Sequence, residues 1–119
     1  MPYVDAFVIP IAKSKVAAYT KMARKAGAIW KELGALEYRE CVGDDLKAAF
    51  GMPFPKMAKT KPSETVLFSW IVYKNKAHRN KVNKLVMKDP RIAAMCDPKN
   101  SPFDVNRMAY GGFKMIVEA

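Results

Sequence analysis

Two carboxylates stand inside apolar, strand-like segments, and side chains of this kind can do acid–base chemistry. Asp5 lies in the alternating segment 3–9, on the same parity as Phe7, and Glu40 lies in the shorter segment 36–42. An ionised carboxylate among apolar side chains is poorly hydrated, which raises its pKa unless a partner compensates. Two carboxylates in one pocket can share a proton, a common basis for catalysis near neutral pH. Asp5 and Glu40 are therefore candidate catalytic residues, expected to point into one space.

Arg107 is the third candidate catalytic residue, since a guanidinium binds a carboxylate or phosphate through two hydrogen bonds. Asp104, three residues earlier, can instead hold it in place. Arg107 can also pair with Asp5 from a neighbouring strand, and this structural interpretation of Asp5 is preferred because buried ion pairs are common outside active sites. Glu40 is explained equally well as an edge charge that blocks unwanted strand pairing.

Aromatic side chains in the strand-like segments are candidate ligand-binding residues, namely Phe68, Trp70 and Tyr110. Large aromatics at such positions more often belong to a core or a dimer interface. With one histidine and two cysteines there is no pattern of metal ligands, and phosphate-loop, serine-hydrolase and common zinc-enzyme motifs are absent. We expect neither a metal nor an organic cofactor.

The segment 64–74 organises the rest of the chain because it is apolar on both parities. Such a strand belongs in the middle of a sheet, where both faces meet packing partners. Alternation of side chains predicts a first strand at 3–9. Charge on both parities predicts an edge strand at 36–42. A final strand is expected at about 107–117, where Gly111 and Gly112 mark a bulge or a close approach of a backbone or ligand.

Two segments show the apolar period of a helix laid on a sheet. The first runs from Ser14, the expected N-cap, to Gly34, the expected stop, and the second covers 75–88. A short helical piece is expected at 91–95. The proline- and lysine-rich segment 46–63 shows no period and is expected to be a long basic loop.

The order βαββαβ predicts an α+β ferredoxin-like sandwich, a four-stranded antiparallel sheet with two helices on one face, as a single domain over 1–119. The other face then stays bare. By side-chain bulk it is expected to carry Tyr3, Phe7, Phe68, Trp70 and Phe113. A wide apolar face of this kind favours association, and we expect a homodimer whose two sheets meet around a twofold axis.

The charge is strongly positive, with 21 Lys and Arg against 11 Asp and Glu and a net charge of +10. This favours loose attraction to polyanions but does not by itself establish a nucleic-acid site. No apolar run reaches the roughly 20 residues of a membrane helix, and residues 1–11 read as a strand and not as a signal peptide. A cytoplasmic protein with reduced thiols and no membrane partner is expected.

Several motifs in one order resemble the bacterial YbaA-like family of uncharacterised small proteins. They are YVDAFV from Tyr3, GAL at 34–36, EC-x-GDD at 40–45, FSW at 68–70, DPR at 89–91 and PFD-x-x-RM-x-YGGF at 102–113. The resemblance covers nearly the whole chain. It implies the dimeric α/β-barrel superfamily, whose members pair ferredoxin-like units and often hold a small ligand between sheet and helices.

Three functions are compatible with these features. The preferred one is a dimer that binds a compact aromatic or anionic molecule, or transforms it without a cofactor as a monooxygenase or isomerase does. A nucleic-acid or polyanion binder is less favoured, because no RNP-like pattern of sheet aromatics is present. The third is a structural or regulatory dimer without a ligand.

Overall fold

The four strands form one antiparallel sheet in the order β2-β3-β1-β4 in a computed structural model that describes residues 1–119. Their bounds are β1 (Tyr3–Ala12), β2 (Glu37–Val42), β3 (Glu64–Tyr73) and β4 (Ala109–Lys114). The strand expected at the centre, β3, is central together with β1, and β2 lies at an edge as predicted. The predicted order of elements and fold class are confirmed.

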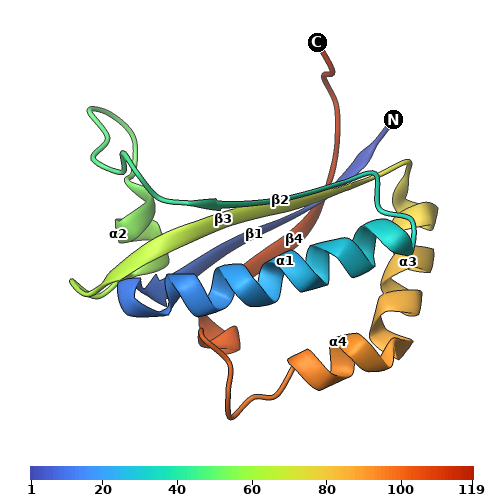
Figure 1. The fold of residues 1–119 in the computed structure, drawn as a ribbon. Coiled ribbons are helices and arrows are strands. Elements are labelled where there is room, and N and C mark those ends of the chain that lie inside the picture. The colour runs from blue at the N-terminus through green and yellow to red at the C-terminus, as the bar shows by residue number, and fades with distance from the viewer.

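Three helices cover one face of the sheet (Figure 1). They are α1 (Val16–Glu32), α3 (Lys76–Lys88) and α4 (Pro90–Met95). Ser14 is not the N-cap of α1: it lies in a 3-10 turn, Lys13–Lys15, that joins β1 to the helix, and Lys15 caps α1 without a side-chain hydrogen bond. Gly34 ends the helical segment as predicted, with a φ of 124° that favours glycine.

The segment expected as a loop, 46–63, contains one short helix, α2 (Phe54–Ala58). Pro53 precedes it and Pro55 lies in its first turn, where a missing N–H costs nothing, and Lys59 ends it with a left-handed φ of 54°. The ring of Phe54 packs edge-on against Phe68 of β3, with 6.3 Å between centroids. Pro53 and Pro55 thus begin a helix that the sequence pattern did not show.

The strand register decides which side chains face the helices. Tyr3 pairs with Tyr73 and Phe7 pairs with Ser69, and Tyr73 and Ser69 are buried beneath the helix layer. Tyr3 and Phe7 therefore point to the helices, and their expected place on the bare face is wrong. Both parities of these strands are apolar, so the handed path of the β-α-β connection sets the facing side and bulk does not.

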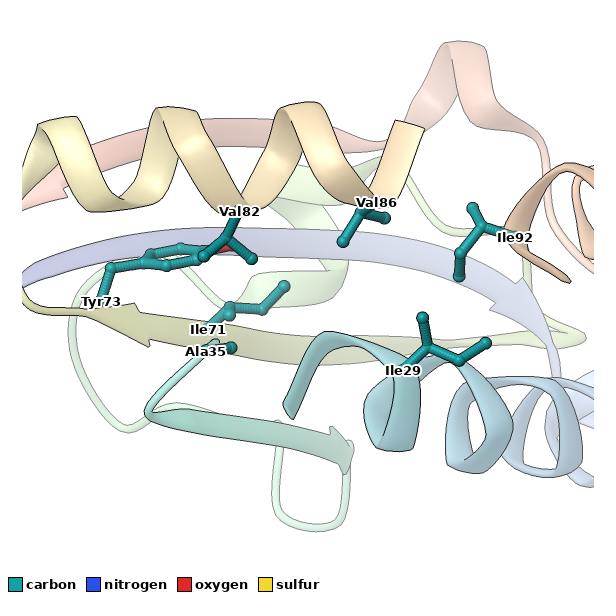
Figure 2. Close-up of a cluster of buried hydrophobic side chains, with 7 residues drawn as sticks. All are labelled: Ile29, Ala35, Ile71, Tyr73, Val82, Val86 and Ile92. Carbon is teal, nitrogen blue, oxygen red and sulfur yellow. The ribbon is translucent and has the colours of Figure 1, made fainter. Parts of the chain in front are cut away.

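The core lies between β3 and the helix layer. Figure 2 shows side chains from α1, α3, α4 and β3 meeting in one cluster, made of Ile29, Ala35, Ile71, Tyr73, Val82, Val86 and Ile92. A second cluster lies where α1 crosses β1 and β3, made of Ile9, Ile11, Tyr19, Ala23 and Leu67. The helices include no candidate membrane-spanning segment.

The glycine pair in β4 is not a bulge. Gly111 pairs with Ala6 and Gly112 with Asp5 in an unbroken register. A Cβ at Gly112 would collide with the side chains of Tyr3 and Arg79. The close approach at this glycine is therefore made by side chains of the same chain.

Candidate functional site

Glu40 is the acceptor of two tyrosine hydroxyls. Tyr19 of α1 donates to its Oε1 at 2.8 Å, and Tyr38 of β2 donates to its Oε2 at 2.7 Å. Tyr38 and Glu40 are two residues apart on a strand and so face the same side, toward α1. The carboxylate is half-buried and fixed at both oxygens.

The two tyrosines owe their positions to the packing of α1. Gly27 leaves space for the ring of Tyr38, whose centroid also lies 6.0 Å from that of Trp30. Tyr19 is 6% exposed and meets Phe103 edge-on at 5.6 Å. Both hydroxyls are thus held by rigid, well-packed rings.

Glu40 lines a cleft of about 520 Å³ between α1 and the edge strand β2. The inner wall is formed mainly by apolar and small side chains, among them Tyr19, Ala23, Gly27, Tyr38 and Leu67. Three cationic side chains also line the cleft, those of Arg24, Lys31 and Arg39. A mostly apolar hollow with few fixed polar groups is the usual form of a small-molecule site.

Both phenols remain neutral donors over the physiological range. Burial raises the pKa of Tyr19 and of Tyr38, and the negative charge of Glu40 raises them further. Each carboxylate oxygen keeps a second lone pair after accepting one phenol. Glu40 can therefore still accept a hydrogen bond, or a proton, from a molecule in the cleft.

Asp5 lies in a separate, closed environment. It is 1% exposed, and Arg79 of α3 donates from Nε to its Oδ1 at 3.0 Å. The same guanidinium lies 4.9 Å from the ring centroid of Tyr3 and donates to its hydroxyl at 3.3 Å. Burial raises the pKa of Asp5, while Arg79 opposes that change. The carboxylate is thus charge-compensated within the fold.

We expected Asp5 and Glu40 to share a pocket, but they do not. Both face the helix layer, but Asp5 pairs with Ile71 across one side of β3 and Glu40 pairs with Ser69 across the other. The central strand therefore separates them, and Asp5 is not among the residues of the cleft.

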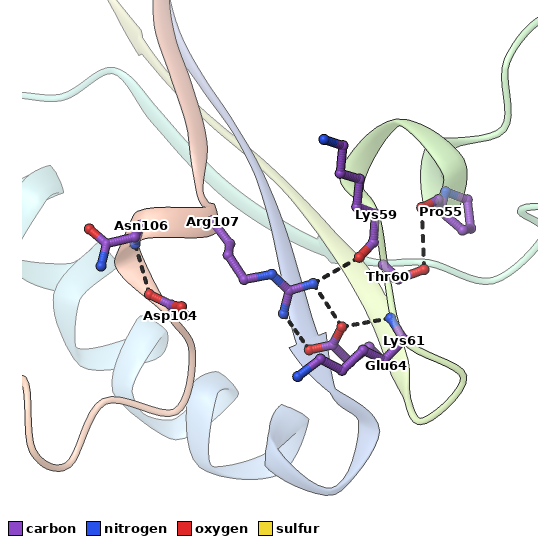
Figure 3. A network of polar contacts seen from close by, with 8 residues as sticks. All are labelled: Pro55, Lys59, Thr60, Lys61, Glu64, Asp104, Asn106 and Arg107. Carbon is purple, nitrogen blue, oxygen red and sulfur yellow. Dashed lines mark hydrogen bonds and ion pairs between the residues drawn. The ribbon is translucent and has the colours of Figure 1, made fainter.

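Arg107 does not pair with Asp5 or with Asp104. Its guanidinium donates to both oxygens of Glu64, at 2.7 and 2.9 Å, and to the carbonyl of Lys59 at 3.0 Å (Figure 3). Asp104 instead accepts from the backbone N–H of Asn106. Hydrogen bonds from Arg107 and from the Lys61 N–H lower the pKa of Glu64 to about 2. The guanidinium is therefore occupied by a bidentate pair that ties β3 to the 3-10 turn before β4, Val105–Arg107.

The three candidate ligand-binding aromatics are divided between the two faces. Phe68 and Trp70 lie on the face opposite α1 and α3, with 5.8 Å between ring centroids, and Phe54 of α2 packs against Phe68 there. The indole N–H of Trp70 donates to Glu37 at 2.9 Å. Tyr110 is on the helix side, where its ring lies 5.0 Å from that of Phe7. None of these rings lines the cleft at Glu40.

Sequence reasoning identified Glu40 but missed its two partners. Tyr19 lies in the first predicted helix among its apolar residues, where a hydroxyl aimed at a neighbouring strand gives no separate signal. Tyr38 shares the parity of Glu40, and that pairing of a phenol and an acid was available as a signal. Arg79, the partner of Asp5, is one of several basic residues in the second predicted helix, and nothing in the sequence distinguishes it from the others.

A four-stranded antiparallel sheet covered on one face by helices, in βαββαβ order, defines a ferredoxin-like α+β protein. Residues 2–105 match the family described as protein of unknown function, DUF1428, and the chain belongs to this family. It is 40% identical over 118 residues to the uncharacterized protein YbaA of Escherichia coli (strain K12), with 99% of each chain covered. The resemblance to the YbaA-like family is confirmed.

Solved structures with low sequence identity share the fold. SnoaB, a cofactor-independent oxygenase from Streptomyces nogalater, has a TM-score of 0.63 at 8% identity, covering 98% of this chain and 95% of that chain. An uncharacterized NIPSNAP domain protein from Burkholderia xenovorans has a TM-score of 0.58 at 14% identity, covering 98% and 97%. A dimeric ferredoxin-like protein from an uncultured marine organism has a TM-score of 0.53 at 11% identity, with both chains fully covered at 100%.

Proposed function

We propose that this protein binds a small aromatic or anionic molecule in the cleft between α1 and β2, with Glu40 as the acceptor that orients it. The observation that carries the proposal is the carboxylate of Glu40, held by Tyr19 and Tyr38 inside a cleft of about 520 Å³. Ligand sites of roughly 300–1,000 Å³ accommodate compact metabolites. A single fixed acceptor on an apolar wall sets orientation without filling the space.

The cleft also supplies the elements of proton transfer without a cofactor. A carboxylate that faces an apolar cavity can take the proton of an acidic O–H or C–H group, as cofactor-independent monooxygenases and isomerases require. The fold shared with SnoaB, described as a cofactor-independent oxygenase, supports this chemistry as the reaction class if turnover follows binding. Glu40 then acts as the base, while the hydroxyls of Tyr19 and Tyr38 hold its carboxylate in position.

The working unit in this proposal is a homodimer. The face of the sheet opposite α1 and α3 exposes Phe68 by 40% and Phe113 by 59%. Two solved structures of this fold are described as dimeric ferredoxin-like proteins. Burying this face against a second copy removes the exposed rings from water and leaves the cleft at Glu40, on the helix side, open to ligand.

A thermal-shift screen of aromatic acids, phenols and other metabolites tests the binding proposal. A ligand of this site raises the melting temperature of the wild type, because it binds the native state only. Glu40→Gln keeps the shape of the side chain but removes its charge, and we expect it to reduce the ligand-dependent shift. Glu118→Gln, the same change at an exposed position near the C-terminus, is the control. Equal shifts in both variants would place the ligand elsewhere.

A second candidate, polyanion binding, is favoured by one observation. The five ion pairs of the structure all use arginine, and no lysine ammonium lies within 4.0 Å of a carboxylate. The lysines therefore leave their charge available on the surface. A filter-binding assay with RNA and DNA oligonucleotides, titrated with salt, separates the two functions, because phosphate neutralisation gives a steep loss of affinity with salt. Weak binding that changes little with salt would leave the lysines as a solvated surface.

A further inference from the structure

We infer that the ligand of the cleft at Glu40 is a hydroxyaryl carboxylate, whose hydroxyl meets Glu40 and whose carboxylate meets Arg24. This inference rests on the proposed function and specifies its ligand. It follows from how α1 arranges its side chains along the cleft and from which of the cationic groups there are already engaged.

Two rows of α1 residues border the cleft, each at helical spacing. Tyr19, Ala23 and Gly27 are buried and form the inner row, next to Glu40. Thr20, Arg24 and Ala28 are exposed and form the outer row. A molecule lying across α1 therefore meets an acceptor at its inner end and a cation at its outer end.

The space between these two ends suits a flat ring. Ala23 carries only a methyl group on the inner row, and Ala28 carries only a methyl group on the outer row. The ring of Tyr38 already covers Gly27, so the free space lies beside the two alanines. Leu67 contributes an apolar side chain from β3. An aromatic ring can therefore lie close to the helix, with apolar contact on its faces.

Arg24 is the cation of the cleft whose side chain has no partner within the protein. Lys31 donates from Nζ to the carbonyl of Leu36 at 2.8 Å, and Arg39 donates from Nη1 to the carbonyl of Tyr38 at 3.1 Å. The side chain of Arg24 makes no hydrogen bond, and none of the five ion pairs involves it. Its guanidinium presents a fork that matches a carboxylate. Of the charged side chains that line the cleft, three are cationic and Glu40 alone is acidic. The cleft thus favours an anion whose charge stays away from Glu40.

The donor of the ligand must be separate from its charged group. The carboxylate of Glu40 repels a second carboxylate but accepts a hydroxyl hydrogen on a lone pair that the tyrosines leave free. A hydroxyl and a carboxylate at opposite ends of an aromatic ring satisfy Glu40 and Arg24 together. A simple phenol or a simple benzoate satisfies one of them only.

Isothermal titration calorimetry with matched probes tests this inference. The probes are 4-hydroxybenzoate, 4-hydroxybenzamide, benzoate and phenol, with 6-hydroxy-2-naphthoate as the larger hydroxy acid. At about 150 mM salt, where general attraction between charges is screened, we expect a hydroxy acid to bind about tenfold or more tightly than any probe that lacks either group. Arg24→Gln should remove the advantage of 4-hydroxybenzoate over 4-hydroxybenzamide, and Arg24→Lys should restore only part of it.

Lys21→Gln is the matched control, because Lys21 is an exposed cation of α1 that does not line this cleft. Its affinity for the hydroxy acids should equal that of the wild type. If the wild type binds the amide as tightly as the acid, or if Arg24→Gln keeps the preference, the inference is wrong while the proposed function stands. If neither the hydroxy acids nor the neutral probes bind, both fail.

Discussion

The ring of Tyr38 lies so close to Gly27 that α1 has no room for a side chain there. A Cβ on Gly27 would stand 2.6 Å from Cδ1 of the ring, well inside contact distance. The two residues belong to different elements, α1 and β2, and their contact sets the distance between helix and strand. It also sets the position of the hydroxyl that Tyr38 donates to Glu40.

We expect Gly27→Ala to destabilise the protein, although alanine is the better helix former. The methyl group has to displace the ring of Tyr38, and overpacking of this kind costs about 1–3 kcal/mol. The free energy of unfolding, from urea titration of the circular dichroism signal, measures the loss. Ligand-dependent thermal shifts should fall as well, because the hydroxyl moves away from Glu40.

The control is the same substitution in a Tyr38→Ala background. With the ring gone, Gly27→Ala should be neutral or stabilising by up to about 1 kcal/mol, since only the helix propensity remains. An equal loss of stability in both backgrounds would mean that the contact with Tyr38 is not the cause.

The fold could be predicted from the sequence because each element carries its own pattern. The apolar parities of β3 placed it in the middle of the sheet, and charges on both parities placed β2 at an edge. The choice of which parity meets the helices could not be made in the same way. Side-chain bulk placed Tyr3 and Phe7 on the bare face. This criterion fails because bulky residues occur on both parities, and only the three-dimensional path of the chain distinguishes them.

The site could be predicted only in part. Glu40 was recognised as an acid in an apolar strand, but its pairing with Tyr19 depends on how α1 crosses β2. Asp5 and Arg107 were predicted to pair because their strands were expected to be neighbours. The structure satisfies each charge from elsewhere, with Arg79 for Asp5 and Glu64 for Arg107. Long-range polar partners follow from the packing of elements and leave no local mark in the sequence.

Arg79→Met should destabilise the protein strongly, by about 3–5 kcal/mol, because it leaves the carboxylate of Asp5 buried without its cation. The pKa of Asp5 is already raised by burial, and it should rise further in the variant. When the pKa of an acid is higher in the folded than in the unfolded state, ionisation of that acid lowers the free energy of unfolding of the protein. The loss occurs between the unfolded pKa and the folded pKa as pH rises. The deficit of the variant should therefore be largest at neutral pH and shrink in acid.

The double variant Asp5→Leu with Arg79→Met tests whether the unpaired carboxylate of Asp5 causes this loss. With neither charge present, no carboxylate is left unpaired, and the double variant should be more stable than Arg79→Met alone. Guanidinium chloride unfolding at several pH values measures both effects. A double variant that is less stable than the single one would show that Arg79 acts through packing and not through Asp5.

The pair of Glu64 and Arg107 predicts an acid-dependent contribution to stability. The pKa of Glu64 is lowered to about 2 from its ordinary 4.5, so its contribution is fully present above about pH 4.5 and is lost as pH falls through about 2. Glu64→Gln should lower the melting temperature at neutral pH, and the difference from wild type should decrease toward pH 2. Asp104→Asn is the control, because Asp104 makes no ion pair with Arg107 in the structure. A difference that stays constant with pH would contradict the assignment.

Substitution by alanine should lower stability at Gly112 of β4 but not at its neighbour Gly111. Gly112→Ala places a methyl group against Tyr3 and the guanidinium of Arg79, and it should disturb the pair with Asp5 and lower stability. Gly111→Ala meets only the ring of Phe113, at 3.6 Å, an ordinary contact distance. It should be tolerated. Thermal melts of both variants decide the matter, and equal losses would indicate that β4 requires glycine for its backbone and not for space.

The sheet face that carries Phe113 is expected to join two copies of the chain. Phe113 is 59% exposed on the sheet face opposite α1 and α3, and Leu85 is 43% exposed on the outer side of α3. We expect sedimentation at micromolar concentration to give a dimer for the wild type and for Leu85→Asp, and a monomer for Phe113→Asp, because a carboxylate buried between two apolar sheets loses its hydration without gaining a partner. Because the cleft at Glu40 lies on the other face, the monomer should still bind ligand. A wild type that sediments as a monomer, or a Phe113→Asp variant that remains dimeric, would mean that this face does not join two copies.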